Sequence, residues 1–83
     1  MYFSAPWCGP CKMFKPVLME VAQEMNVGIK DVNVDYDASL AQKYDVSSIP
    51  TLIIFDPQGN VLYRNSGAMS RDQLKNAFSH YKN

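Results

Sequence analysis

The stretch WCGPCK (residues 7–12) contains both cysteines of this 83-residue chain, and it decides how the rest is interpreted. Cys8 and Cys11 are three residues apart at the start of a segment with helical periodicity. They therefore lie on one face of a helix, close enough to form a disulfide. Such a bond opens and closes without unfolding the chain. The spacing favours reversible dithiol chemistry.

Two other roles for the cysteine pair, a structural disulfide and a metal site, are less well supported. A disulfide that closes a four-residue loop stabilises a protein by only about 2 kcal/mol, against about 3 kcal/mol for a fifteen-residue loop, because it removes little freedom from the unfolded chain. A tetrahedral zinc site needs four ligands, and beyond the cysteine pair the chain offers a single histidine, His80. We therefore expect no intramolecular metal site. An iron–sulfur centre shared between two chains is disfavoured almost as strongly.

The composition is that of a small, neutral protein. Hydrophobic residues make up 47% of the chain, and eight basic side chains balance eight acidic ones. This length predicts a single domain over residues 1–83. There is no basic run to bind nucleic acid or a membrane surface, and no apolar stretch of roughly 20 residues to span a bilayer. The first residues lack the pattern of a signal peptide, so a cytoplasmic location is expected.

Hydrophobic periodicity predicts seven elements in the order β-α-β-α-β-β-α. The expected strands cover residues 1–3, 29–34, 51–55 and 61–65, and the expected helices cover residues 8–25, residues 38–44 and a last segment that follows Ser70. The apolar run TLIIF (51–55) suits a central strand covered on both faces. A right-handed crossover makes the first two strands parallel, and the turn at 56–60 returns the last strand antiparallel. The fold class is therefore α/β, a four-stranded mixed sheet flanked by helices, with WCGPC at the carboxyl end of a strand.

Four features together resemble the thioredoxin family: WCGPCK, Pro16 five residues after the second cysteine, SIPT (48–51) before an apolar strand, and the late glycine Gly67. The resemblance covers nearly the whole chain. It implies a thioredoxin-like fold and a thiol-disulfide oxidoreductase that reduces protein disulfides. It also implies protein disulfide substrates, a thioredoxin reductase as electron donor and no bound cofactor.

Position and resemblance together assign roles to the residues of the CGPC segment. Cys8 lies at the helix start, where unpaired N–H groups and the helix dipole favour a thiolate, so it is expected to be the nucleophile. Cys11, one turn further on, is expected to be more buried and to resolve the mixed disulfide. Gly9 and Pro10 are expected to contact substrate, and in the family this pair is typical of a reductant.

The resemblance also implies a substrate-binding surface around the cysteines. In the family, the proline at the place of Pro50 is cis and faces the thiols, which leaves the backbone of Ile49 to pair with an extended substrate. Trp7 could be an ordinary core residue, but beside an exposed dithiol we expect it to form an apolar contact surface with Ile49, Gly67 and Ala68. Gly67 is expected to permit close approach of a partner, although a simple turn explains it equally well.

Two features depart from the family pattern. Thioredoxins usually carry an extra strand and helix ahead of the strand that leads to WCGPC. Residues 1–83 do not include them, so the expected topology is that of a glutaredoxin. Thioredoxins also place a buried aspartate where this sequence has Tyr2, and a lysine where it has Asp31. We hypothesise that Asp31 takes over the catalytic role of that aspartate, through water and with Tyr2 as its hydrogen-bond partner. The alternative, a solvated edge residue, fits the sequence equally well.

Three other functions stay open at this point. A glutaredoxin-like reductase would need a glutathione site, against which Trp7 and the Gly-Pro pair argue. A non-enzymatic accessory subunit of a larger complex would use the same surface as a clamp, with idle cysteines. An iron–sulfur carrier would be coloured. A monomer is expected, with a dimer through a free sheet edge as the alternative.

Overall fold

The computed structural model describes residues 1–81 and contains the seven elements in the predicted order. They are β1 (Tyr2–Ser4), α1 (Gly9–Glu24), β2 (Asp31–Asn33), α2 (Ala38–Lys43), β3 (Thr51–Phe55), β4 (Val61–Ser66) and α3 (Arg71–His80). The single-domain prediction extends to residues 82 and 83, which lie outside the described residues. No helix within residues 1–81 is long and apolar enough to cross a membrane.

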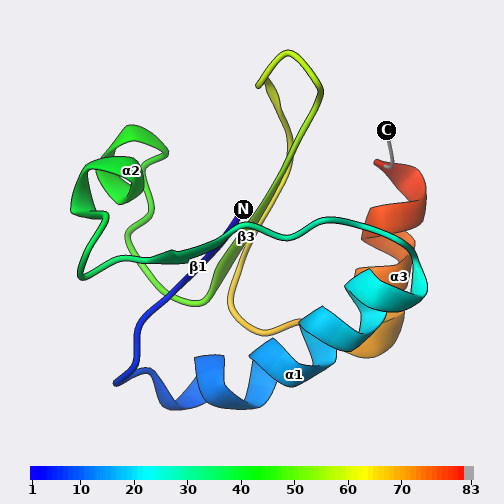
Figure 1. Cartoon of the computed structure of the whole chain (residues 1–83), viewed down its shortest axis with the longest axis horizontal. Helices are drawn as coiled ribbons and strands as arrows, with labels where there is room; N and C mark the ends of the chain where they lie inside the picture. Colours follow the sequence, from blue (N-terminus) through cyan, green and yellow to red (C-terminus); the bar gives the residue numbers. More distant parts are fainter. Residues whose placement is uncertain (82–83) are drawn as a thin grey trace.

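The four strands form one mixed sheet in the order β2-β1-β3-β4 (Figure 1). β1 pairs parallel with β2, and β3 pairs antiparallel with both β1 and β4. The predicted parallel crossover, the antiparallel return and the inner position of β3 are therefore confirmed. β2 is shorter than the predicted strand 29–34 because β1, its neighbour in the sheet, offers only three residues for pairing.

Helix α1 begins directly at the cysteine pair. Cys8 is its N-cap, with an extended backbone, and the Cys8 sulfur accepts a hydrogen bond from the Cys11 N–H at 3.2 Å. Pro10 is in the first turn, where a missing N–H costs the helix nothing. Phe14 and Leu18 lie on the buried face of the helix, which packs against α3. The helix thus fixes the cysteines at its N-terminal end.

Helix α3 starts at the predicted N-cap, Ser70. The Ser70 hydroxyl accepts from the Gln73 N–H at 3.2 Å, and the Gln73 side chain accepts from the Ser70 N–H at 2.9 Å. This reciprocal capping box satisfies two N–H groups that the helix itself leaves unpaired. Arg71, in the first turn, then forms ion pairs with Glu20 and Glu24 of α1. The cap sets where α3 begins, and the exposed ion pairs add a small contribution to the apolar packing of α3 against α1.

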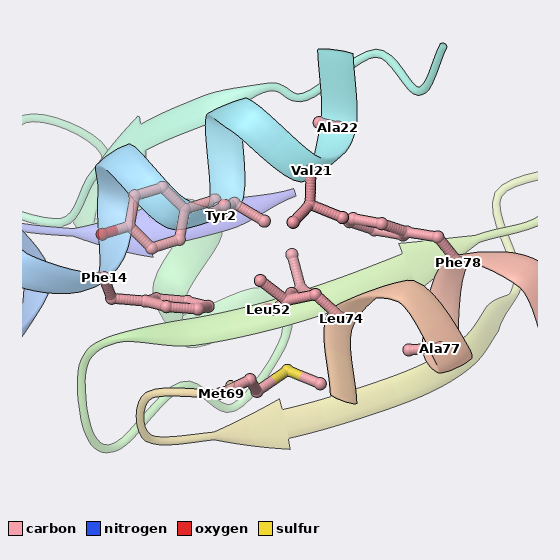
Figure 2. Close-up of a cluster of buried hydrophobic side chains, with 10 residues drawn as sticks. Tyr2, Phe14, Val21, Ala22, Leu52, Met69, Leu74, Ala77 and Phe78 are labelled. Carbon is pink, nitrogen blue, oxygen red and sulfur yellow. The ribbon is translucent and has the colours of Figure 1, made fainter. Parts of the chain in front are cut away.

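The core consists of two layers separated by the sheet. Side chains alternate along a strand, so neighbouring residues enter opposite layers. Tyr2 and Leu52 pack with α1 and α3 (Figure 2), whereas Phe3 and Ile53 pack in a second cluster with side chains of α2. All four are at most 1% exposed. The sheet thereby joins the helix that carries the cysteines to the rest of the molecule.

The N-terminal amine makes stability depend on pH. Met1 donates to the Ile53 carbonyl at 2.7 Å. Burial, and to a lesser extent the charge of Lys30, lower the pKa of this amine from 8.0 to about 6. The unfolded chain therefore binds the proton more readily between pH 6 and 8, so stability of the 83-residue chain should rise over that window. We expect a gain of up to about 2 kcal/mol, allowing for the part of the amine that water still screens.

The measurement is the urea midpoint at pH 6 and at pH 8, compared between the free and the N-terminally acetylated chain. Acetylation removes the charge but keeps an N–H donor for Ile53. The acetylated chain should lose this part of the pH dependence and be the more stable of the two at pH 6. An equal pH dependence in both chains would contradict the prediction.

Candidate active site

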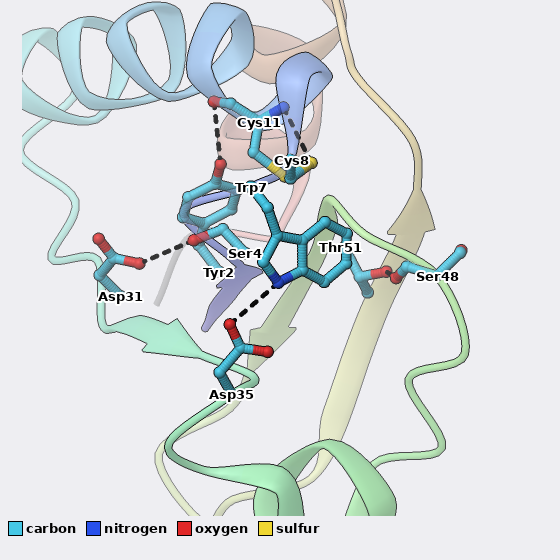
Figure 3. Close-up of a disulfide and its surroundings, with 9 residues drawn as sticks. All are labelled: Tyr2, Ser4, Trp7, Cys8, Cys11, Asp31, Asp35, Ser48 and Thr51. Carbon is cyan, nitrogen blue, oxygen red and sulfur yellow. Dashed lines mark hydrogen bonds between the residues drawn. A yellow bond between two sulfur atoms is a disulfide. The ribbon is translucent and has the colours of Figure 1, made fainter.

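Cys8 and Cys11 form a disulfide with their Cα atoms 5.3 Å apart (Figure 3). The expectation of an exposed dithiol is wrong, since Cys8 is 5% and Cys11 3% exposed. The reason is packing: the pair clusters with Ala5 and with the half-buried side chains of Val34 and Ile49. Cys11 is the more buried of the two, as predicted, although the difference is small.

Trp7 lies on the surface next to the cysteines and is 67% exposed, so it is not a core residue. Its indole Nε1–H donates to a carboxylate oxygen of Asp35 at 3.0 Å (Figure 3). The Asp35 N–H in turn donates to the Asn33 side chain at 2.9 Å. The orientation of the indole is therefore set by the loop that follows β2.

Asp35 was missed by the sequence analysis. The sequence did indicate that Asp35 could lie near the cysteines. Asp35 follows β2 and WCGPC follows β1, and the carboxyl ends of parallel strands meet at the same edge of a sheet. The sequence does not show which polar side chain after β2 would reach the indole. That contact depends on the path of the loop between β2 and α2.

The Ile49–Pro50 peptide bond is cis, as the resemblance implied. Ile49 packs beside the cysteine pair, and the Pro50 carbonyl accepts from the Gly67 N–H at 2.7 Å. Gly67 has φ of +98°, a backbone conformation that L side chains rarely adopt, and a Cβ added there would meet open space. Ala68 is exposed. The structure thus brings Ile49, Pro50 and Gly67 to the end of the sheet that carries the disulfide.

A hollow of about 380 Å³ lies between Trp7 and the segment before Pro50. Val34 and Ile49, which pack against the cysteines, also line it. Gly9 and Pro10 are exposed at the adjoining start of α1. Trp7, Gly9, Pro10 and Ile49 therefore provide a partly apolar, accessible surface beside the disulfide.

Asp31 lies at the edge of the sheet, with its side chain 37% exposed. One carboxylate oxygen is 2.6 Å from the Lys15 ammonium, and the other accepts from the Ser4 hydroxyl at 3.4 Å. The predicted hydrogen bond between Asp31 and Tyr2 is wrong. Although the two residues are paired in the β1–β2 register, the long tyrosine ring directs its hydroxyl to α1, where it donates to the Cys11 carbonyl at 3.3 Å (Figure 3).

The environment of Tyr2 keeps its hydroxyl neutral. Burial raises the pKa of the phenol, and the nearby negative charge of Asp31 raises it further. Tyr2 therefore serves as a hydrogen-bond donor to α1. Within residues 1–81, no group of three or more histidine, cysteine, aspartate or glutamate side chains is arranged to hold a metal ion.

A disulfide at the first turn of a helix, next to a cis proline and on a four-stranded mixed sheet, defines a thioredoxin-like fold with a redox-active cysteine pair. Comparison with known proteins agrees. The thioredoxin family model matches residues 1–80. The chain is 44% identical over 75 residues to a thioredoxin of Chlamydia pneumoniae and 45% identical over 75 residues to one of Bacillus subtilis, which covers 89% and 88% of this chain.

Solved structures give the same result. A mutant thioredoxin from Halobacterium salinarum superposes with a TM-score of 0.90 over 99% of this chain, at 33% identity. The chain belongs to the thioredoxin family and is a thiol-disulfide oxidoreductase with Cys8 and Cys11 as its redox pair. The matches cover 72% and 71% of the two bacterial relatives, which are therefore longer.

Proposed function

We propose that the protein reduces protein disulfides, with Cys8 as the attacking thiolate and Cys11 as the resolving thiol. The observation that supports these roles is the cap of α1, where the Cys8 sulfur accepts the Cys11 N–H at 3.2 Å. An N–H donor and the positive end of the helix dipole both stabilise negative charge on that sulfur. Cys11 lies inside the first turn, so its sulfur is not at the N-cap where negative charge is stabilised.

The reaction proceeds in two displacement steps. The Cys8 thiolate attacks one sulfur of a substrate disulfide, a bond forms between the two sulfurs, and the other substrate sulfur leaves as a thiolate. Cys11 then loses its proton and attacks the Cys8 sulfur. This step forms the Cys8–Cys11 disulfide seen in the structure and releases the second substrate thiol. A thioredoxin reductase returns two electrons to the pair.

The substrate binds at the surface formed by Trp7, Gly9, Pro10, Ile49, Pro50, Gly67 and Ala68. Trp7 offers a large apolar face whose orientation the Asp35 hydrogen bond fixes. An extended substrate segment pairs with the backbone of Ile49, which would hold its disulfide over Cys8. Burial of Cys8 limits attack to disulfides that reach this surface.

Trapping tests the assignment of the two cysteines. In Cys11→Ser, the first step proceeds but the second cannot, so we expect a covalent complex with a disulfide-bonded test protein. In Cys8→Ser, Cys11 should give little or no complex, because its sulfur is not at the N-cap of α1, where a thiolate is stabilised. Non-reducing electrophoresis and intact mass measure the complex in both variants. Equal trapping by the two variants, or trapping by Cys8→Ser alone, would overturn the assignment.

A further inference from the structure

Cys11 lines a second hollow of about 600 Å³, distinct from the one beside Trp7. It is open to solvent, and its walls come from β1 and the loop after it, from α1 and from β2. The polar residues that line it are Tyr2, Ser4, Lys12, Lys15, Asp31 and Asn33. Cys11 therefore borders a hollow that opens to solvent on this side of the molecule.

Among the charged and titratable groups that line this hollow, one is an anion that can accept a proton. Lys12 and Lys15, from α1, are cations without a free lone pair. Tyr2, from β1, is kept neutral and its hydroxyl donates to the Cys11 carbonyl. The carboxylate of Asp31, from β2, is the only anion among the residues of the described chain that line this hollow.

The Asp31 carboxylate is held from two sides. Lys15 of α1 lies 2.6 Å from one oxygen, and the Ser4 hydroxyl of β1 donates to the other at 3.4 Å. Lys15 is one helical turn beyond Cys11, so the same helix carries the thiol and the group that orients the carboxylate. The ion pair is half exposed, at 49% and 37% of the two side chains, so water reaches the carboxylate.

We propose that Asp31 accepts the proton of Cys11 in the resolving step, through water in this hollow, with Lys15 as the residue that positions the carboxylate. The inference rests on the proposed function above. The Cys11 proton passes to water and from water to Asp31, while the Cys11 sulfur forms its bond to the Cys8 sulfur. The bond between Cys8 and the substrate breaks, and the substrate sulfur leaves with the electron pair. Asp31 then returns its proton to the leaving thiolate through solvent.

The sign of the mutational effect separates this proposal from simple charge repulsion. If the Asp31 charge acted only through its field, it would disfavour a thiolate at Cys11, and its removal would speed the resolving step. If it accepts the proton, its removal slows that step. General bases contribute about 10²–10⁴-fold when in direct contact, so we expect about a tenfold effect through water.

The test uses one equivalent of dithiobis-nitrobenzoate, an aromatic disulfide, mixed with the reduced protein in a stopped-flow instrument. One coloured thiolate is released when Cys8 attacks, and a second when Cys11 resolves the mixed disulfide. Asp31→Asn should slow the second phase about tenfold at pH 7 and leave the first unchanged. Its second phase should also rise more steeply with pH, because hydroxide must replace the carboxylate. Asp37→Asn, the same change at an exposed residue before α2, is the matched control.

Three further measurements test the proposal if Asp31→Asn folds poorly. Asp31→Glu should restore part of the second-phase rate. Lys15→Gln should slow the second phase about threefold, and high salt should do the same to the parent protein, because an exposed ion pair is screened. A second phase that is unchanged or faster in Asp31→Asn, with a normal first phase, overturns the proposal. Loss of the first phase in the parent protein would instead refute the proposed function.

Discussion

Replacing Cys8 with serine is expected to reduce the rate at which the protein catalyses reduction of a disulfide-bonded protein by dithiothreitol to the uncatalysed rate. A serine hydroxyl at the α1 N-cap keeps the capping hydrogen bond, so the fold should survive. It cannot form a mixed disulfide, and Cys11 lies inside the first turn of α1, away from the N-cap position that stabilises a thiolate, so it should not replace Cys8 as the attacking group. The measurement is the initial rate beside the parent protein, with circular dichroism to confirm folding.

The pH profile adds a second criterion. The helix N-terminus stabilises the thiolate, so the rate of attack should reach half its maximum below about 8.5, the ordinary pKa of a free cysteine thiol. A folded Cys8→Ser protein that retains the parental rate would contradict the proposed mechanism. A folded parent protein without any Cys8-dependent rate would favour the accessory-subunit alternative.

The second large effect concerns stability and falls on the central strand. Ile53 is fully buried in the cluster that also contains Phe3 and Val32, on the face of the sheet covered by α2. Truncation to alanine leaves a cavity there, and we expect Ile53→Ala to lower the free energy of unfolding by about 2–5 kcal/mol. A domain of this size has only about 4–12 kcal/mol in total. The urea midpoint should therefore fall by about 2 M or more.

Leu62→Ala is the matched control. Leu62 lies on the edge strand β4 and is 38% exposed, so the same kind of truncation removes less buried surface and should cost about 1 kcal/mol or less. Similar midpoints for the two variants would show that β3 does not carry the core in the way described. The comparison needs only urea curves followed by the fluorescence of Trp7 or by circular dichroism.

Much of the active site was predictable because its determinants are local. The spacing of Cys8 and Cys11 and the cap at Ser70 depend on residues within one turn of a helix, and the structure places them as predicted. The TLIIF strand was assigned with its observed limits because a continuous apolar run needs cover on both faces. The cis bond before Pro50 came from the family resemblance, since most bonds before proline are trans.

The predictions that failed concern contacts between elements. The sequence placed Asp31 and Tyr2 on neighbouring strands, and the register indeed pairs them, but their hydrogen-bond partners belong to other elements. The exposure of the dithiol was overestimated because the side chains that cover it, such as Ile49, are about forty residues away in the chain. Single-domain organisation, a cytoplasmic location and the oligomeric state stay predictions.

By itself, the sequence determined the order of the elements, the helix that presents the dithiol and the family to which the chain belongs. These follow from periodicity, capping and short motifs, which act over a few neighbouring residues. Only the tertiary structure decided that Trp7 is held by Asp35 and that Lys15 orients Asp31 beside the hollow at Cys11. Those contacts depend on the register of β1 with β2 and on the rotation of α1 over the sheet, which are set by core packing between residues far apart in the chain.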